Sequence, residues 1–126
     1  RSILFVRTVK SSCDRLVVMS KGETKYQADL IGKIERLLPG CSVFKNNPEE
    51  LQGVPDLLIL FENHWAMLEV KLAHDSDVRP NQQYYVDHFN SMSFCAFIFP
   101  ENEKEVLDAL QSAFGVSRQT RLFKSK

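Results

Sequence analysis

Two short apolar segments constrain the fold of this chain more than any other feature: residues 57–61 and 65–68 are separated by a brief polar break. Nearly continuous apolar runs of this length are typical of strands that are covered on both faces of a sheet. A short polar break between two such runs predicts a hairpin. Asp56 precedes the first run, and Glu69 and Lys71 follow closely after the second. Because the two open ends of a hairpin lie side by side, we expect these three charged side chains to lie together.

Two carboxylates and an amine at the end of a buried hairpin cost free energy unless they bind a metal or form an ion pair. Glu69 and Lys71 are two residues apart and share one face of the strand, whereas Val70 points into the core. A hard dication such as Mg²⁺ takes oxygen ligands, and Asp56, Glu69 and the carbonyl of Val70 would provide three. Such a metal lowers the pKa of a bound water and neutralises charge on a scissile phosphate.

Lys71 has two open roles in such a site: it orients or deprotonates the attacking water, or it holds a phosphate oxygen as a point charge. The alternative is a structural ion-pair network at the end of the hairpin, which is common on half-exposed strands. The apolar character of both strands favours the metal site, because buried unpaired acids are rare.

The other patterns predict one small α/β domain with a mixed sheet. Residues 1–20 form an N-terminal hairpin or arm, residues 20–115 the core, and residues 116–126 a basic tail. The predicted order of elements in the core is helix, three strands, helix, strand, helix. Helices are predicted at residues 23–38, 80–90 and 103–114, and strands at residues 41–46, 56–61, 66–72 and 94–99.

The formal net charge is zero, but the charges are segregated along the chain. Residues 1–21 contain five basic residues and one acid, and residues 116–126 contain four basic residues and no acid, whereas residues 22–115 contain seven basic and fifteen acidic residues. Basic ends around an acidic centre suit a protein whose flanks contact a polyanion while its centre holds cations. The alternative interpretation is two solvated tails.

Several classes of protein are excluded or disfavoured by composition. No apolar run is long enough to span a membrane, and the first residues are too short an apolar stretch for a signal peptide. The chain lacks an initiator Met, so its true start is expected to be missing. Three widely spaced cysteines without a CxxC pair argue against a zinc site or a disulfide framework, and predict a reducing, cytoplasmic location.

Taken together, the motifs resemble the PD-(D/E)XK nuclease superfamily, and within it the virus-type replication-repair nuclease (VRR-NUC) branch. The resemblance covers roughly residues 20–100, with five elements in the family's order. The matching segments are Glu23 on a helix, Val43-Phe44-Lys45-Asn46, Gly53-Val54-Pro55-Asp56-Leu57-Leu58, Leu68-Glu69-Val70-Lys71, and Arg79-Pro80-Asn81-Gln82 with Tyr85. The last segment departs from the family's usual Ser-Pro-Glu-Gln but keeps the Pro and the Gln.

The resemblance implies a restriction-endonuclease-like core and Mg²⁺- or Mn²⁺-dependent cleavage of DNA, with Asp56, Glu69 and Lys71 as the catalytic core. It also implies that Glu23 is a helix-borne acid near the metal and that Gln82 faces the site. Glu23 has an alternative role as the acid of a capping box with Ser20. Gln82 has an alternative as a solvated helix residue.

Structured or branched DNA is the implied substrate by similarity to VRR-NUC and Holliday junction resolvases, and the branch is frequent in phages and in DNA repair. A homodimer would give a two-cut activity, and no membrane or organic cofactor is expected. The second hypothesis is a catalytically inactive DNA-binding module of the same fold. Predicted nucleic-acid contacts are Lys45, Asn46, Arg79, Arg118, Arg121 and Lys124.

Overall fold

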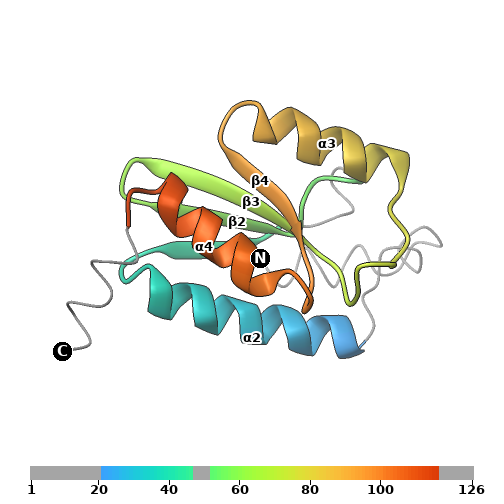
Figure 1. The fold of residues 1–126 in the computed structure, drawn as a ribbon, viewed down its shortest axis with the longest axis horizontal. Helices are drawn as coiled ribbons and strands as arrows, with labels where there is room; N and C mark the ends of the chain where they lie inside the picture. The colour runs from blue at the N-terminus through green and yellow to red at the C-terminus, as the bar shows by residue number, and fades with distance from the viewer. Residues whose placement is uncertain (1–20, 47–51, 117–126) are drawn as a thin grey trace, which may run out of the picture.

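The computed structural model of the protein describes residues 21–46 and 52–116. In chain order the elements are a helix, three strands, a helix, a strand and a helix, which confirms the predicted order (Figure 1). They are α2 (Lys21–Leu37), β1 (Ser42–Lys45), β2 (Leu57–Phe61), β3 (His64–Val70), α3 (Pro80–Asn90), β4 (Phe94–Ile98) and α4 (Glu103–Ala113). The predicted N-terminal hairpin or arm, the Ser20 cap and most of the basic tail lie outside the described residues.

The four strands form one mixed sheet in the order β1-β2-β3-β4. β1 pairs with β2 and β2 with β3 in antiparallel fashion, whereas β3 and β4 are parallel. Parallel neighbours need a crossover connection, and α3 provides it. A mixed sheet flanked by helices was predicted, and this part of the prediction is confirmed.

The hairpin between β2 and β3 is tighter than predicted. The sequence pattern places His64 in the polar break, whereas in the structure His64 pairs with Phe61 and begins β3. The turn therefore contains only Glu62 and Asn63, and Glu62 has a positive φ of 56°. Two-residue hairpin turns require such left-handed backbone, because it matches the twist of the flanking strands. The start of β3 consequently moves towards the N-terminus relative to the prediction.

Helices cover the two faces of the sheet unequally. α2 and α4 lie on one face, where their apolar side chains pack with those of the strands in the main core (Figure 1). α3 lies on the opposite face, over β3 and β4, where Val86 packs with Met67 and Cys95. The main core comprises Leu30, Ile34, Leu38, Leu57, Ile59, Phe61, Ala66, Leu68, Val70, Ile98, Val106, Leu107, Leu110 and Phe114.

This arrangement corrects one detail of the burial prediction. β3 is buried on both faces from residue 66 to residue 70, as expected, but β2 is buried on alternate residues only. Leu60 remains 40% exposed, and Phe44 on the adjacent strand β1, which pairs with Leu58, is 39% exposed. The reason is that α3 packs on β3 and β4 and leaves the same face of β1 and β2 less covered.

Polar contacts between helices join the two that share the main core. The hydroxyl of Tyr26 on α2 donates to Glu103 at the start of α4, and Lys33 forms an ion pair with the same carboxylate. Burial and the negative charge of Glu103 raise the pKa of Tyr26.

Within the described ranges, no helix is both long and apolar enough to cross a bilayer.

Candidate active site

Strand register places Asp56 beside Glu69. Leu57 and Leu68 are partners across β2 and β3, so the next pair beyond them is Asp56 and Glu69. On the far side of Asp56, Asn46 continues β1, and its backbone N–H donates to the Asp56 carbonyl at 2.8 Å. Because partners across a sheet point to the same face, the Asn46, Asp56 and Glu69 side chains are on the face that carries α3.

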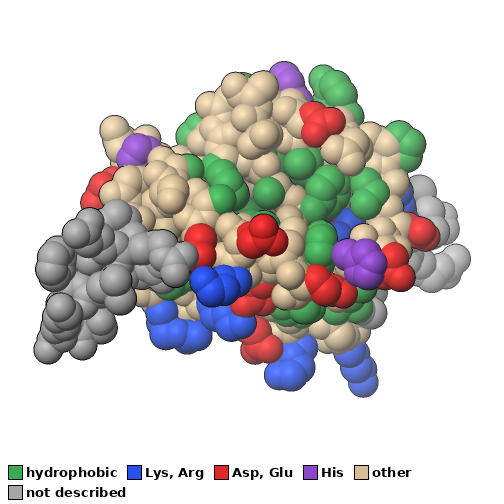
Figure 2. All heavy atoms as spheres, viewed as in Figure 1, with side chains coloured by type: hydrophobic (Ala, Val, Ile, Leu, Met, Phe, Trp, Pro, Cys, Tyr) green, Lys and Arg blue, Asp and Glu red, His purple; other side chains and the backbone are tan. Residues whose placement is uncertain are grey.

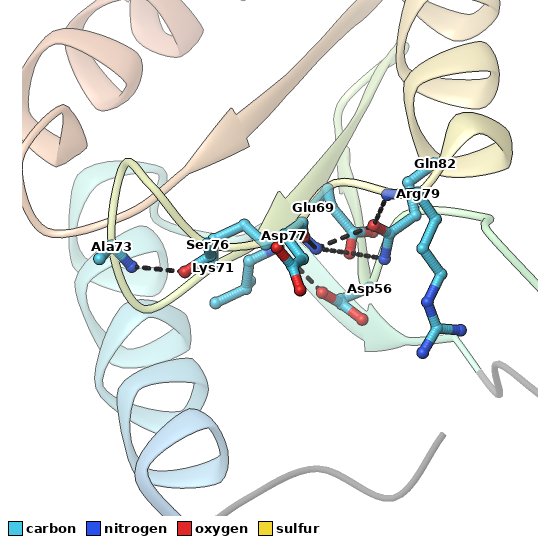
Figure 3. A network of polar contacts seen from close by, with 9 residues as sticks. Asp56, Glu69, Lys71, Ala73, Ser76, Asp77, Arg79 and Gln82 are labelled. Carbon is cyan, nitrogen blue, oxygen red and sulfur yellow. Dashed lines mark hydrogen bonds and ion pairs between the residues drawn. The ribbon is translucent and has the colours of Figure 1, made fainter. Parts of the chain in front are cut away.

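Asp56 and Glu69 lie side by side, and each side chain also accepts a hydrogen bond from another protein group (Figure 3). The Oδ2 atom of Asp56 accepts from the backbone N–H of Val70 at 2.9 Å. The Oε2 atom of Glu69 accepts from the side-chain amide of Gln82 at 3.0 Å. Glu69 is only 4% exposed, so its carboxylate depends on these protein groups rather than on bulk water.

Lys71 follows β3 directly and is also buried, with 9% of its surface exposed. Its ammonium group donates to the carbonyl of Asp77 at 2.8 Å and to Oε1 of Gln82 at 2.9 Å. The ammonium nitrogen lies 3.9 Å from Oε2 of Glu69. The turn at residues 73–76, closed by the Ser76 hydroxyl, brings the chain back so that the Asp77 carbonyl meets Lys71.

Gln82 contacts both Glu69, near the end of β3, and Lys71, which follows it. The start of α3 sets the position of Gln82. Pro80 occupies the first turn of the helix, where its missing N–H is not needed. Gln82 lies in that turn, and its Oε1 atom also accepts from the backbone N–H of Arg79 at 3.0 Å. The side-chain amide of Gln82 therefore accepts hydrogen bonds from Lys71 and from the Arg79 N–H at the start of the helix, and donates one to Glu69.

The electrostatics of the pair favour a bound cation. Burial, followed by the charge of Asp56, raises the pKa of Glu69 above neutrality. Burial also raises the pKa of Asp56, against the opposing effects of the Val70 N–H and the Lys71 charge. The half-buried acid Asp56 and the buried acid Glu69 thus lie beside the ammonium group of Lys71, and a divalent cation would relieve the repulsion between the two carboxylates.

The donor set fits a hard dication in its chemistry. Carboxylate oxygens are the ligands of Mg²⁺, which binds through one or two carboxylates and keeps several waters. Asp56 and Glu69 are adjacent and provide such oxygens, and the Val70 carbonyl stays a predicted third donor. Among residues 21–46 and 52–116, no three His, Cys, Asp or Glu side chains lie together as a metal-binding group. A cation at this position would therefore be held by two carboxylates and by water rather than by protein side chains alone.

Glu23 lies in the first turn of α2 and is half-buried. Its charge contributes to the raised pKa of Asp56, which means that the helix brings a third acid towards this end of the sheet. Its placement agrees with a helix-borne acid near the site. Its role as a ligand stays a prediction.

The predicted nucleic-acid contacts divide into two groups. Lys45 is exposed at the end of β1, and Arg79 is exposed at the start of α3. Asn46 differs, because its side-chain amide donates to the carbonyl of Pro55. Arg118, Arg121 and Lys124 lie outside the described residues.

Two residues of the site escape prediction from sequence. Asp77 acts through its backbone carbonyl, so its residue type carries no signal. Asn81 contacts the loop that precedes Asp56, where its amide donates to the carbonyl of Gln52 at 3.2 Å. Gly53 was the available signal, because its positive φ of 94° and its close approach to Asn81 both require glycine.

The fold and the polar cluster at the end of its hairpin define a restriction-endonuclease-like α/β domain, as the motif predicts. One solved structure, titled "VRR_NUC domain", shares this fold with a TM-score of 0.56 and 22% sequence identity. The match covers 75% of this chain and 99% of that one. The comparisons with protein-family models and with curated proteins find no match. The VRR-NUC resemblance is thereby confirmed at the level of the fold.

Proposed function

We propose that this domain is a Mg²⁺- or Mn²⁺-dependent deoxyribonuclease that hydrolyses phosphodiester bonds. The observation that carries the proposal is the pair Asp56 and Glu69, which are adjacent in the strand register and have raised pKa values, with the Lys71 ammonium group 3.9 Å from Glu69. A structural ion pair matches one acid to one base, whereas this cluster sets two acids beside the ammonium group of Lys71, and the second acid has no cation of its own in the contacts described. The likeness to a VRR_NUC domain supports the same proposal.

Each residue of the cluster has a role in this proposal. Asp56, Glu69 and the Val70 carbonyl would hold the cation, and Glu23 would add an acid from α2. When bound, the cation lowers the pKa of a water molecule and neutralises charge on the phosphate. Lys71 orients the water or contacts a phosphate oxygen. Gln82 holds the side chains of Glu69 and Lys71 in position through its two hydrogen bonds.

Structured or branched DNA is the substrate class that we propose, with the exposed cations Lys45 and Arg79 at the site end of the sheet as phosphate contacts. We also propose that the protein forms a homodimer.

A reducing, cytoplasmic setting is the last part of the proposal, and the thiols agree with it. Cys41 and Cys95 are free thiols. Burial raises the pKa of Cys95 to about 12, which supports a packing role for this cysteine rather than a reactive one.

The test is cleavage of labelled branched, linear and single-stranded DNA with and without Mg²⁺ or Mn²⁺. We expect metal-dependent cleavage by the parent protein and a loss of about 10²-fold or more with Asp56→Asn, which preserves size and removes the charge. Asp29→Asn on the exposed face of α2 is the matched control.

Two outcomes would contradict the nuclease proposal. If the parent protein cleaves none of the substrates in either metal but binds DNA, the domain is a catalytically inactive binding module. If Asp56→Asn cleaves as well as the parent, the cluster is not the active site.

A further inference from the structure

The loop that carries Asp56 is held from the β1 side by Asn46. The backbone N–H of Asn46 donates to the Asp56 carbonyl at 2.8 Å, and its side-chain amide donates to the carbonyl of Pro55. Both nitrogens of Asn46 therefore bind consecutive peptide groups of the loop. The peptide groups on either side of the Asp56 Cα set the direction in which its side chain leaves the backbone, and Asn46 donates a hydrogen bond to each of them.

The other end of the same loop is held by Asn81 on α3. Its amide donates to the Gln52 carbonyl at 3.2 Å, and its side chain lies against Gly53. A Cβ atom on Gly53 would lie 2.7 Å from Nδ2 of Asn81, which is closer than van der Waals contact permits. Loop and helix can approach this closely only because residue 53 is glycine.

The contacts of Asn81 and Gln82 place both halves of the site under one helical turn. Asn81 binds the loop before Asp56, and the next residue, Gln82, binds Glu69 and Lys71 after β3. The first turn of α3 thus sets the loop relative to the strand, while Asn46 sets the loop relative to β1. Asp56 and Glu69 each come from one of these two parts.

We propose that Asn46 and Asn81 are positioning residues that hold Asp56 at binding distance from a cation shared with Glu69. This inference rests on the proposed metal-dependent function. It also assigns Asn46 a role other than phosphate contact. Groups that orient metal ligands through hydrogen bonds typically change metal affinity by about 10–100-fold when they are removed.

The experiment compares Asn46→Ala and Asn81→Ala with Asn90→Ala. Asn90 lies at the opposite end of α3, where its side chain accepts a hydrogen bond from the backbone N–H of Cys95 at 3.3 Å. It therefore controls for the loss of one asparagine contact to backbone away from the site. Where Asn46→Ala does not fold, Asn46→Ser removes the amide and keeps a small polar side chain.

The first readout is calorimetric titration of the folded, DNA-free proteins with Mn²⁺, followed by the dependence of cleavage rate on metal concentration. We expect the affinity of Asn46→Ala and Asn81→Ala to fall by about 10-fold or more, and that of Asn90→Ala to change by less than about 2-fold. At saturating metal the cleavage rates of the two site variants should recover towards the parent value, which a general loss of structure would not allow.

The outcomes separate this inference from the function on which it rests. If the parent binds Mn²⁺ and both site variants bind it as Asn90→Ala does, the positioning role is wrong and the nuclease proposal stands. If Asn46→Ala loses DNA affinity without metal and keeps its Mn²⁺ affinity, Asn46 is a phosphate contact instead. If the parent binds no metal, the proposed function is wrong and the positioning role is wrong with it.

Discussion

Removing the charge of Glu69 should stabilise the metal-free protein. Glu69 is 4% exposed and lies beside Asp56, and the pKa of its carboxyl group in the folded state is raised. In the unfolded chain its pKa is about 4.3. Above that pH the unfolded carboxyl is ionised, so folding must either take up a proton or bury a charge. The cost is absent below the unfolded pKa and grows as the pH rises towards the folded pKa.

The size of the effect follows from the pH difference. Each pH unit between the unfolded pKa and the buffer is worth about 1.4 kcal/mol, which at pH 7 sets an upper limit of about 4 kcal/mol. Lys71 and Gln82 contact the group and lower this cost. In Glu69→Gln, the amide oxygen can still accept from Gln82 and the amide nitrogen can donate to Asp56. We therefore expect the free energy of unfolding to rise by about 1–3 kcal/mol at pH 7.

Urea denaturation with a chelator present, at pH 4 and at pH 7, measures this difference. The two proteins should be nearly equal in stability at pH 4 and should diverge by pH 7. Glu105→Gln, an exposed change on α4, is the matched control and should show no such divergence. A variant that is less stable than the parent at pH 7, or a difference independent of pH, would refute the argument that Glu69 is an electrostatically strained group.

Three further predictions follow from the site. Lys71→Ala should reduce metal-dependent cleavage by about 10²–10⁴-fold in single-turnover assays, and unchanged cleavage would exclude a role for its ammonium group. Apparent Mg²⁺ affinity should increase from pH 6 to pH 8 in calorimetry, because two carboxyl groups with raised pKa values must lose protons to bind the ion; an affinity independent of pH would contradict this. Gly53→Ala should lower the free energy of unfolding by about 1–3 kcal/mol in urea melts, because of its positive φ and the nearby Asn81 side chain, whereas equal stability would mean that the loop adapts freely.

Sequence patterns predict the architecture well where local signals are strong. Pro80 marks the start of α3, and the predicted range 80–90 matches the helix. The burial of β3 on both faces also follows from its continuous apolar run. The predicted start of β3 is two residues too late, because the residue types of Glu62 and Asn63 do not indicate that Glu62 adopts a left-handed conformation.

The site shows a similar division. Two charged positions on one strand and an acid across the hairpin predict the neighbourhood of Asp56, Glu69 and Lys71, because strand geometry alone brings them together. The supporting contacts are not predictable in this way. The carbonyl of Asp77 contacts Lys71 whatever its side chain is, and the contact of Asn81 with the Gly53 loop depends on how closely α3 packs on the sheet.

The first turn of α3 gives the site a particular kind of cooperativity. Asn81 contacts the loop before Asp56, while Gln82 contacts both charged residues at the end of β3. Fraying of this one turn would release all of these contacts at once, whereas the four-stranded sheet behind them would persist. The turn and its contacts would then open together as a small subglobal unfolding unit. Its opening free energy, rather than the global stability of the fold, would set the fraction of molecules in which Asn81 and Gln82 hold the candidate site together.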